Sequence, residues 1–207
     1  MINALAEAAG QDVPRETLEK VEAFVTMLRE ENERQNLIAR STLETLWDRH
    51  LIDSAQLMRF GAAEGGRWVD VGSGAGFPGI VLSILAGKSM MLVEPRKLRA
   101  DFLQRCIEQL DLPNSEVFPH KVERLQGSFD VVTARAVAPV DRLFAMTLHL
   151  AHGGTRWILP KGRNGAKELA DARRAWQGRF RTEASITDPE AVVLVADGVK
   201  PKGGTGR

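Results

Sequence analysis

The sequence contains no tyrosine, one cysteine and only four histidines among its 207 residues. A single cysteine, Cys106, excludes an internal disulfide and a metal site built from several cysteines, so we expect no bound metal. Cys106 lies in an apolar run with Leu103 and Ile107, which predicts a buried structural thiol. The scarcity of tyrosine and histidine leaves few side chains for proton transfer near neutral pH.

The sequence also lacks an excess of charge and a long apolar run. Its 28 basic and 27 acidic side chains give a formal net charge of +1, so any affinity for nucleic acid must come from a local patch. No stretch approaches the roughly 20 apolar residues of a membrane-spanning helix, and residues 1–10 show no signal-peptide pattern. We therefore expect a cytoplasmic protein without a membrane partner, acting as a monomer.

The first 60 residues have the pattern of helices. Apolar residues recur at helical spacing, with charges between them, at Leu18, Val21, Val25 and Leu28. Ser41-Thr42-Leu43-Glu44 matches a capping box and predicts that a second helix begins there. We therefore expect a helical extension over residues 1–60.

After Gly65-Gly66, short apolar runs alternate with helical patterns. Strands are predicted near Trp68–Val71, Met90–Glu94, Glu116–Pro119, Asp130–Arg135 and Trp157–Pro160. Helices are predicted near Gly79–Ala86, Leu98–Leu110, Val140–Leu150 and Ala166–Gln177. This alternation is typical of a parallel sheet with helices on both faces.

Two further strands are predicted at the end of the domain, near Arg181–Ile186 and Val192–Ala196. The short connection between them suits an antiparallel hairpin. The expected fold class is α/β and Rossmann-like: a mostly parallel sheet with an antiparallel terminal hairpin and an N-terminal helical extension. We assign residues 61–199 to this domain and residues 200–207, rich in glycine and lysine, to a disordered tail.

A glycine-rich segment, Asp70-Val-Gly-Ser-Gly-Ala-Gly-Phe-Pro-Gly79, follows the first predicted strand. Glycines allow a tight turn and a close approach of a ligand, and the next helix begins with free amides. The segment contains the dinucleotide pattern GxGxxG, which is weak evidence by itself. Glu94, at the end of the second strand, can accept hydrogen bonds from ribose hydroxyls in either a dinucleotide or a nucleoside cofactor.

Asp70 favours S-adenosylmethionine over NAD. A carboxylate two residues before the first glycine can orient the loop, or attract the cationic amino-acid end of S-adenosylmethionine through water. An NAD-dependent oxidoreductase stays open as an alternative, although it needs a proton-handling residue beside the nicotinamide. A glycine turn without a ligand is the third interpretation. The expected cofactor contacts in the loop and the next strand are Asp70, Gly72, Ser73, Gly74, Gly76, Phe77 and Glu94.

Several segments together resemble the RsmG (GidB) family, in order along residues 20–197. They are Asn36–Ile38, Trp47–Ser54, Asp70–Gly79, Glu94–Lys97 with Phe102-Leu103, Phe129–Ala136 and Lys161-Gly162. The resemblance implies a Rossmann-like, class I S-adenosylmethionine-dependent methyltransferase with an N-terminal helical extension. It implies methylation of a guanine N7 in 16S rRNA, near the decoding site of the small ribosomal subunit. A non-catalytic RNA-binding assembly factor with the same fold is the remaining alternative.

The resemblance also implies particular contacts. Gly72 and Phe77 would contact the cofactor, Val122 and Glu123 would lie at its adenine, and Arg135 would reach the site from the fourth strand. Two positions depart from the family pattern. Lys121 stands where the family usually has an arginine, and Pro160 suggests that the fifth strand ends early.

Guanine N7 carries a lone pair and no proton, so its methylation requires no general base and depends on position. Arg135 and Lys161 each follow a predicted strand, and we expect them to act in catalysis by holding O6 or flanking phosphates. An internal ion pair, for instance with Glu123 or Asp130, is the structural alternative for Arg135. Asp53 is the candidate for stabilising the cationic product.

Arg49, His50 and Asp53 form a second group of candidates. Arg49 and Asp53 are four residues apart, which predicts an ion pair along a helix, and His50 lies on the adjacent face. The alternative interpretation is an ordinary helix surface, with His50 hydrogen-bonded and packing the helix onto the domain. The full set that we expect to bind substrate is Arg49, His50, Lys97, Arg135 and Lys161.

Overall fold

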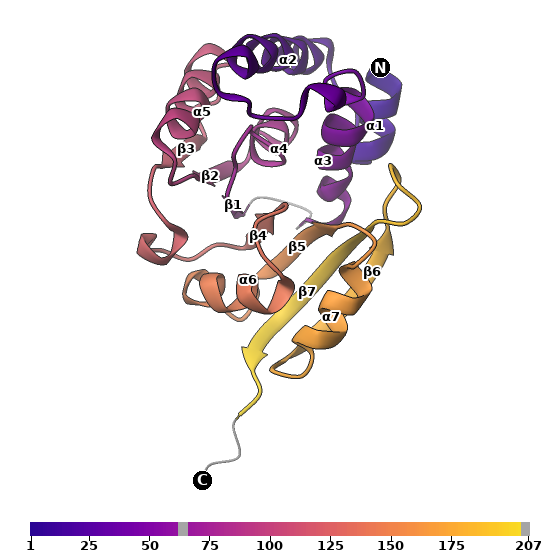
Figure 1. Ribbon diagram of the computed structural model, residues 1–207, viewed down its shortest axis with the longest axis vertical. Coiled ribbons are helices and arrows are strands. Elements are labelled where there is room, and N and C mark those ends of the chain that lie inside the picture. Colours follow the sequence, from indigo (N-terminus) through magenta and orange to yellow (C-terminus); the bar gives the residue numbers. More distant parts are fainter. Residues whose placement is uncertain (62–65, 204–207) are drawn as a thin grey trace.

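The computed structural model describes residues 1–61 and 66–203, and its centre is a seven-stranded sheet in the order β3-β2-β1-β4-β5-β7-β6 (Figure 1). The strands are β1 (Arg67–Val71), β2 (Ser89–Val93), β3 (Ser115–Phe118), β4 (Val131–Ala134), β5 (Arg156–Lys161), β6 (Trp176–Ala184) and β7 (Val192–Pro201). The first five are parallel, whereas β7 runs antiparallel to β5 and β6. The expected sheet with its antiparallel terminal hairpin is confirmed.

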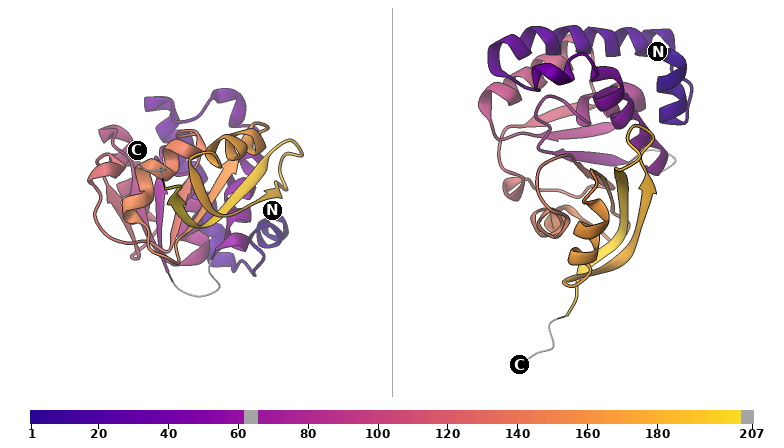
Figure 2. Two further views of the ribbon diagram at one scale, coloured as in Figure 1. Left: turned by 90° about the horizontal axis from the view of Figure 1, so that it is seen from below. Right: turned by 45° about the vertical axis from the view of Figure 1, so that its right-hand side comes forward.

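Helices cover both faces of the sheet (Figures 1 and 2). They are α4 (Gly79–Ala86) and α5 (Lys97–Gln109) on one face, and α6 (Val140–Thr147) and α7 (Gly165–Ala172) on the other. Successive side chains along each strand point to opposite faces of the sheet and pack against the helices on each face. In β1, Trp68 packs with α4 and α5, whereas Val69 and Val71 pack with α6. Cys106 of α5 is fully buried, as predicted.

Helix α2 (Arg15–Gln35) packs on the outer side of α4 and α5, whereas α1 (Ile2–Ala9) packs against residues 47–60. Both helices share the apolar cluster of α4 and α5. Phe24 of α2 is completely buried, and Gly76 of the glycine loop comes within contact distance of its ring. The extension is therefore packed directly against the loop that we expect to bind the cofactor (Figure 2). Within the described parts of the chain, no helix is both long enough and apolar enough to span a membrane.

The helix that the capping-box pattern predicts at Ser41, after α2, begins later in the structure. Ser41 belongs to a short 3-10 turn (Arg40–Thr42), and the helical run begins near Trp47. It passes through a π-helical turn η2 (Trp47–Ile52), α3 (Asp53–Ala55) and a 3-10 turn (Gln56–Phe60). The Asn32 side chain accepts the amide of Ile38 at 2.8 Å, which holds the chain in a non-helical path after α2.

The C-terminal third departs from prediction in three places. Helix α7 ends at Ala172, because Trp176 belongs to β6 and is buried against Phe144. Strand β5 continues through Pro160 to Lys161. It pairs with β4 only as far as Ile158, so proline meets a partner strand on one side alone.

The remaining correction concerns the predicted tail. Lys200 and Pro201 are the last residues of β7, and the Lys202 amide donates to the Ala175 carbonyl at 2.8 Å. These residues therefore belong to ordered structure. Residues 204–207 of the predicted tail, and Gly65 of the predicted Gly-Gly break, lie outside the described residues.

Candidate active site

The glycine loop connects β1 to α4, and its glycines have a backbone conformation that residues with a side chain rarely adopt. Gly72, Gly74 and Gly76 have φ values of 73°, 54° and 93°. A Cβ added to Gly72 would lie 2.6 Å from Cγ2 of Val137, and one on Gly76 would lie 2.9 Å from the Phe24 ring. The glycines therefore allow both the turn and the close approach of neighbouring elements.

Asp70 holds this loop from inside the core. Its Oδ2 accepts the Gly79 amide at 3.1 Å, and its Oδ1 accepts the Thr133 hydroxyl of β4 at 2.9 Å. The Ser73 hydroxyl donates to the Asp70 carbonyl at 3.0 Å. Complete burial raises the pKa of Asp70 to about 6. Of its two expected roles, these contacts support orienting the loop.

A pocket of about 510 Å³ opens between the loop and the ends of β2 and β4. Its lining includes the expected cofactor residues Gly72, Ser73, Gly74, Phe77, Glu94, Val122, Glu123 and Arg135. Glu94 is buried, and its carboxylate accepts the amides of Gly74 at 3.1 Å and Arg96 at 2.8 Å. A carboxylate oxygen has two acceptor sites, so Glu94 can still bind ribose hydroxyls.

Apolar side chains complete this pocket. They are Leu37, Ile38, Val71, Val93, Val122 and Met146. An apolar slot for a base, a buried carboxylate for a ribose and a bare glycine backbone together fit a nucleoside cofactor. Asp70 and Gly76 do not line the pocket; they support the loop from behind.

A second pocket of about 860 Å³ shares one wall with the first. The shared residues are Arg135, Ala136 and Val137, which directly follow β4. Ala136 has a φ of 56°, an uncommon conformation for a residue with a side chain. The second pocket is lined by four of the expected substrate-binding residues, Arg49, His50, Arg135 and Lys161, and by Asp53, which was predicted to act in catalysis.

Arg135 joins this wall to the N-terminal extension. Its Nη1 donates to Asp53 Oδ2 at 3.1 Å and to the Arg49 carbonyl at 3.3 Å, and its Nη2 donates to Nδ1 of His50. The guanidinium also lies 5.7 Å from the centre of the Phe77 ring. Burial opposes the charged form and lowers the pKa of Arg135, while Asp53 opposes that shift.

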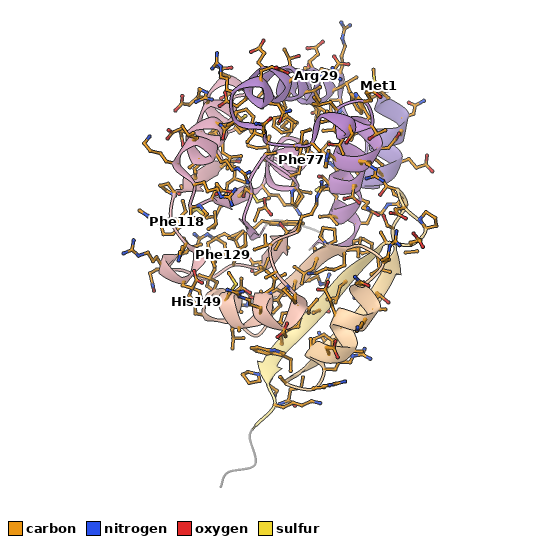
Figure 3. All side chains as sticks on the ribbon, in the orientation of Figure 1. Met1, Arg29, Phe77, Phe118, Phe129 and His149 are labelled. Carbon is orange, nitrogen blue, oxygen red and sulfur yellow. The ribbon has the colours of Figure 1, made fainter. Side chains whose placement is uncertain are left out.

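His50 stacks on Phe77, with ring centres 4.8 Å apart. Phe77 is nearly buried and lies between α4 and α3, inside the outline of the molecule (Figure 3). Burial, reinforced by Arg135 and Arg49, lowers the pKa of His50 to about 4, so the imidazole is neutral at pH 7. Because Nδ1 accepts from Arg135, the proton of the neutral ring belongs on Nε2.

Asp53 connects the site to the terminal hairpin. Its Oδ1 accepts the Thr187 hydroxyl at 3.1 Å and the Gln56 side-chain amide at 2.8 Å. Gln56 also donates to Ser185 and accepts the Ile186 amide. Burial raises the pKa of Asp53, and its three side-chain donors oppose that change.

The model of the GidB family, described as rRNA small subunit methyltransferase G, matches residues 17–190. The ribosomal RNA small subunit methyltransferase G of Zymomonas mobilis subsp. mobilis is 43% identical over 199 residues, covering 92% of this chain and 90% of that protein. The protein of the same name from Rhizorhabdus wittichii is 46% identical over 196 residues, with coverages of 92% and 90%. This chain belongs to the rRNA small subunit methyltransferase G (GidB) family.

Solved structures agree on the fold of this GidB-family chain. A SAM-dependent methyltransferase from Aquifex aeolicus aligns with a TM-score of 0.57 and 15% identity, covering 75% of this chain and 92% of its own. A mutant of MtNAS in complex with S-adenosylmethionine aligns with a TM-score of 0.58 and 22% identity, covering 86% of this chain and 74% of its own. The expected Rossmann-like class I fold, the S-adenosylmethionine cofactor and the small-subunit rRNA methyltransferase class are confirmed. The comparisons do not support an NAD-dependent oxidoreductase or a non-catalytic factor.

Three predicted residues of the GidB-family site have unexpected surroundings. Lys161 lines the larger pocket, but its ammonium is tied to the Ala138 carbonyl at 2.8 Å and to Glu168 at 3.0 Å. Lys97 lines neither pocket and pairs with Asp101 on the surface of α5.

The third residue is Arg49, which does not form the predicted ion pair with Asp53. That carboxylate turns inward to Arg135, and among the described residues the Arg49 guanidinium has no hydrogen-bonding or ionic partner. The internal ion pair that was the structural alternative for Arg135 is present, but its partner is Asp53 in place of Glu123 or Asp130.

Sequence reasoning missed several lining residues. Arg99 and Arg142 line the smaller pocket, and Gln56 and Thr187 hold Asp53 in the wall of the larger one. Ile38 also lines the smaller pocket. It lies in a segment that resembles the GidB family, but the resemblance implied no contact for it. No local pattern marks these residues, since each reaches the site through tertiary packing.

Proposed function

We propose that this protein transfers the methyl group of S-adenosylmethionine to N7 of a guanine in 16S rRNA. The larger pocket would take the guanine and the smaller pocket the cofactor. The observation that carries this assignment is the wall of Arg135, Ala136 and Val137 that both pockets share. The two pockets meet along this short loop, so a guanine in one pocket would bring N7 past the loop to the methyl group of a cofactor in the other.

The smaller pocket supplies the contacts that a nucleoside cofactor needs. Glu94 would accept the ribose hydroxyls, Val122 and Glu123 would lie at the adenine, and Gly72 and Ser73 would face the amino-acid part. S-adenosylmethionine contributes an electrophilic methyl group. The protein has to hold the nucleophile in line with that group.

The larger pocket suits a nucleophile that carries no proton. N7 of guanine needs no general base, and His50, with a pKa lowered to about 4, is neutral and already bonded to Arg135. Arg135 would donate to O6 or a flanking phosphate, leaving the N7 lone pair free. Asp53, in the same wall, would stabilise the positive charge that develops on the methylated ring.

Lys161 acts in this proposal through the loop that follows β4. Its ammonium and Glu168 Oε2 hold the Ala138 carbonyl and the Val140 amide, the latter at 3.2 Å. The pair therefore fixes the wall that carries Arg135. We assign Lys161 a positioning role, in place of a direct contact with substrate.

The proposal is tested by incubating the protein with labelled S-adenosylmethionine and small ribosomal subunits that lack the modification. The label should appear on one guanine of 16S rRNA, and chemical cleavage at N7-methylguanine should map it. Label on another atom or another RNA would refute the proposed target. RNA binding without transfer of label would refute methyl transfer itself.

We also infer a cytoplasmic monomer in which residues 1–60 and 61–199 work as one unit. Ribosomal RNA is a cytoplasmic substrate, and Phe24 of the extension packs on the glycine loop. Light scattering of the purified protein should give a mass near 22.8 kDa. A stable dimer at micromolar concentration would contradict the monomer.

A further inference from the structure

Three cations at the mouth of the smaller pocket have no described partner. Arg96 precedes α5, Lys121 follows β3, and Arg142 belongs to α6, so three separate elements bring them to one pocket. All three side chains are exposed. Within residues 1–61 and 66–203, none of them makes a side-chain hydrogen bond or ion pair.

These cations do not match the charge of the cofactor. S-adenosylmethionine carries a sulfonium and an ammonium against one carboxylate, so its net charge is positive, and unpaired cations around it are repulsive. Glu94 is buried, and among the described residues it forms no ion pair with any of the three cations. Glu123 is the remaining carboxylate in the lining. The rim of this pocket, formed by Arg96, Lys121 and Arg142, therefore has the positive charge expected of a surface that binds a polyanion crossing the pocket mouth.

The position of the rim indicates which polyanion it would bind. The three cations lie beside the smaller pocket, across the Arg135–Val137 wall from the proposed guanine pocket. On the far side of that wall, the larger pocket carries the Arg49 guanidinium, which has no side-chain partner among the residues that the structure describes. An RNA strand with its guanine in the larger pocket would thus meet cations on both sides of the wall.

We propose that the backbone of the substrate RNA crosses the mouth of the cofactor pocket, with its phosphates bound by Arg96, Lys121 and Arg142. This proposal rests on the proposed function. Bound RNA then covers the cofactor, so S-adenosylmethionine must enter before the RNA, and S-adenosylhomocysteine leaves only after the RNA has dissociated.

The test combines RNA affinity with cofactor dissociation in a triple variant, Arg96→Gln, Lys121→Gln and Arg142→Gln. Affinity for small subunits lacking the modification is measured against salt concentration. Three lost phosphate contacts should lower the slope of log K against log salt by about two to three. Dissociation of labelled S-adenosylhomocysteine is followed by rapid filtration. Bound subunits should slow this dissociation at least tenfold in the wild-type protein and far less in the variant.

The matched control is Arg179→Gln, an exposed, unpaired arginine that lines neither pocket. It should leave both measurements at wild-type values, and the triple variant should bind S-adenosylmethionine normally without RNA. A wild-type salt slope in the triple variant would overturn the inference. So would wild-type dissociation of S-adenosylhomocysteine that subunits do not slow. Either result can occur while the wild-type protein still methylates RNA, so these failures are distinct from failure of the proposed function.

Discussion

Arg135 is the residue at which three distant parts of the chain meet. It follows β4, its guanidinium contacts Asp53, His50 and the Arg49 carbonyl of the N-terminal extension, and it lies over the Phe77 ring of the glycine loop. An arginine is suited to this position because its planar fork donates in several directions at once. The side chain is thus fixed before substrate arrives, which is the condition for catalysis by position.

Replacing Arg135 should abolish most methyl transfer. The variant Arg135→Ala combined with Asp53→Asn avoids leaving a buried carboxylate unpaired. Because Asp53 has its own proposed role, the reference is Asp53→Asn alone, and relative to it we expect single-turnover transfer to fall about 100-fold or more. Arg135→Lys keeps the charge but loses the planar guanidinium with its several donors, so its single-turnover rate should be about as low. Thermal unfolding serves as the control for folding. Turnover within twofold or so of wild type would remove Arg135 from the mechanism.

Asp70 should give stability a characteristic dependence on pH. Burial raises its pKa from 3.8 to about 6, so between these values the folded state binds more protons than the unfolded state. The stability that Asp70 contributes is complete below pH 4 and is lost as pH rises through 6, a change of about 3 kcal/mol. Relative to Asp70→Asn, wild-type protein should therefore lose unfolding free energy between pH 4.5 and 6.5. Urea unfolding at several pH values measures this, and parallel curves would contradict it.

At the scale of elements, the loops after β1 and β4 form the site together. Val137 of the second loop lies over Gly72 of the first, and Ala136 adopts its uncommon backbone between them. Lys161 and Glu168 clamp the second loop from β5 and α7. Each loop is thus held by residues from other elements, which explains how a strained turn keeps one geometry.

The variant Gly72→Ala should weaken cofactor binding. Its Cβ would lie 2.6 Å from Val137, at a position with a φ of 73°, so the wall between the pockets has to move. We expect affinity for S-adenosylmethionine, measured by calorimetry, to fall about tenfold or more, equivalent to about 1.4 kcal/mol. Gly87→Ala is the matched control, since Gly87 has a φ of 57° and open space around it. Gly87 lines neither pocket, so this control should keep wild-type affinity, and equal affinities of the two variants would contradict the prediction.

At the scale of the whole molecule, the N-terminal extension is part of the catalytic domain's core. One apolar cluster contains residues of α1 and α2 together with residues of α4, α5 and the sheet. The same extension supplies His50 and Asp53 to the larger pocket, and Gln56 ties it to the terminal hairpin. The N-terminal extension and the β6–β7 hairpin therefore meet beside the wall that carries Arg135.

Truncation of Phe24 should test this integration. The ring is completely buried and lies 5.4 Å from Phe77, so Phe24→Ala should cost about 3–5 kcal/mol in urea unfolding. It should also weaken S-adenosylmethionine binding, because Gly76 packs on the same ring. Phe24→Leu retains most of the volume and should cost clearly less. A loss of stability without any loss of affinity would show that the glycine loop does not depend on α2.

The sequence by itself determined the fold class, the order of the elements and the glycine loop. Hydrophobic periodicity and glycine spacing are local properties, and a parallel sheet brings the carboxyl ends of its strands to one edge whatever the details of packing. The tertiary structure alone decided the partners of the charged residues. Asp53 pairs with Arg135 instead of Arg49, Lys161 pairs with Glu168, and Lys97 stays at the surface. A long charged side chain takes whichever partner the fold brings within reach, so the spacing of Arg49 and Asp53 along the chain did not by itself specify an ion pair between them.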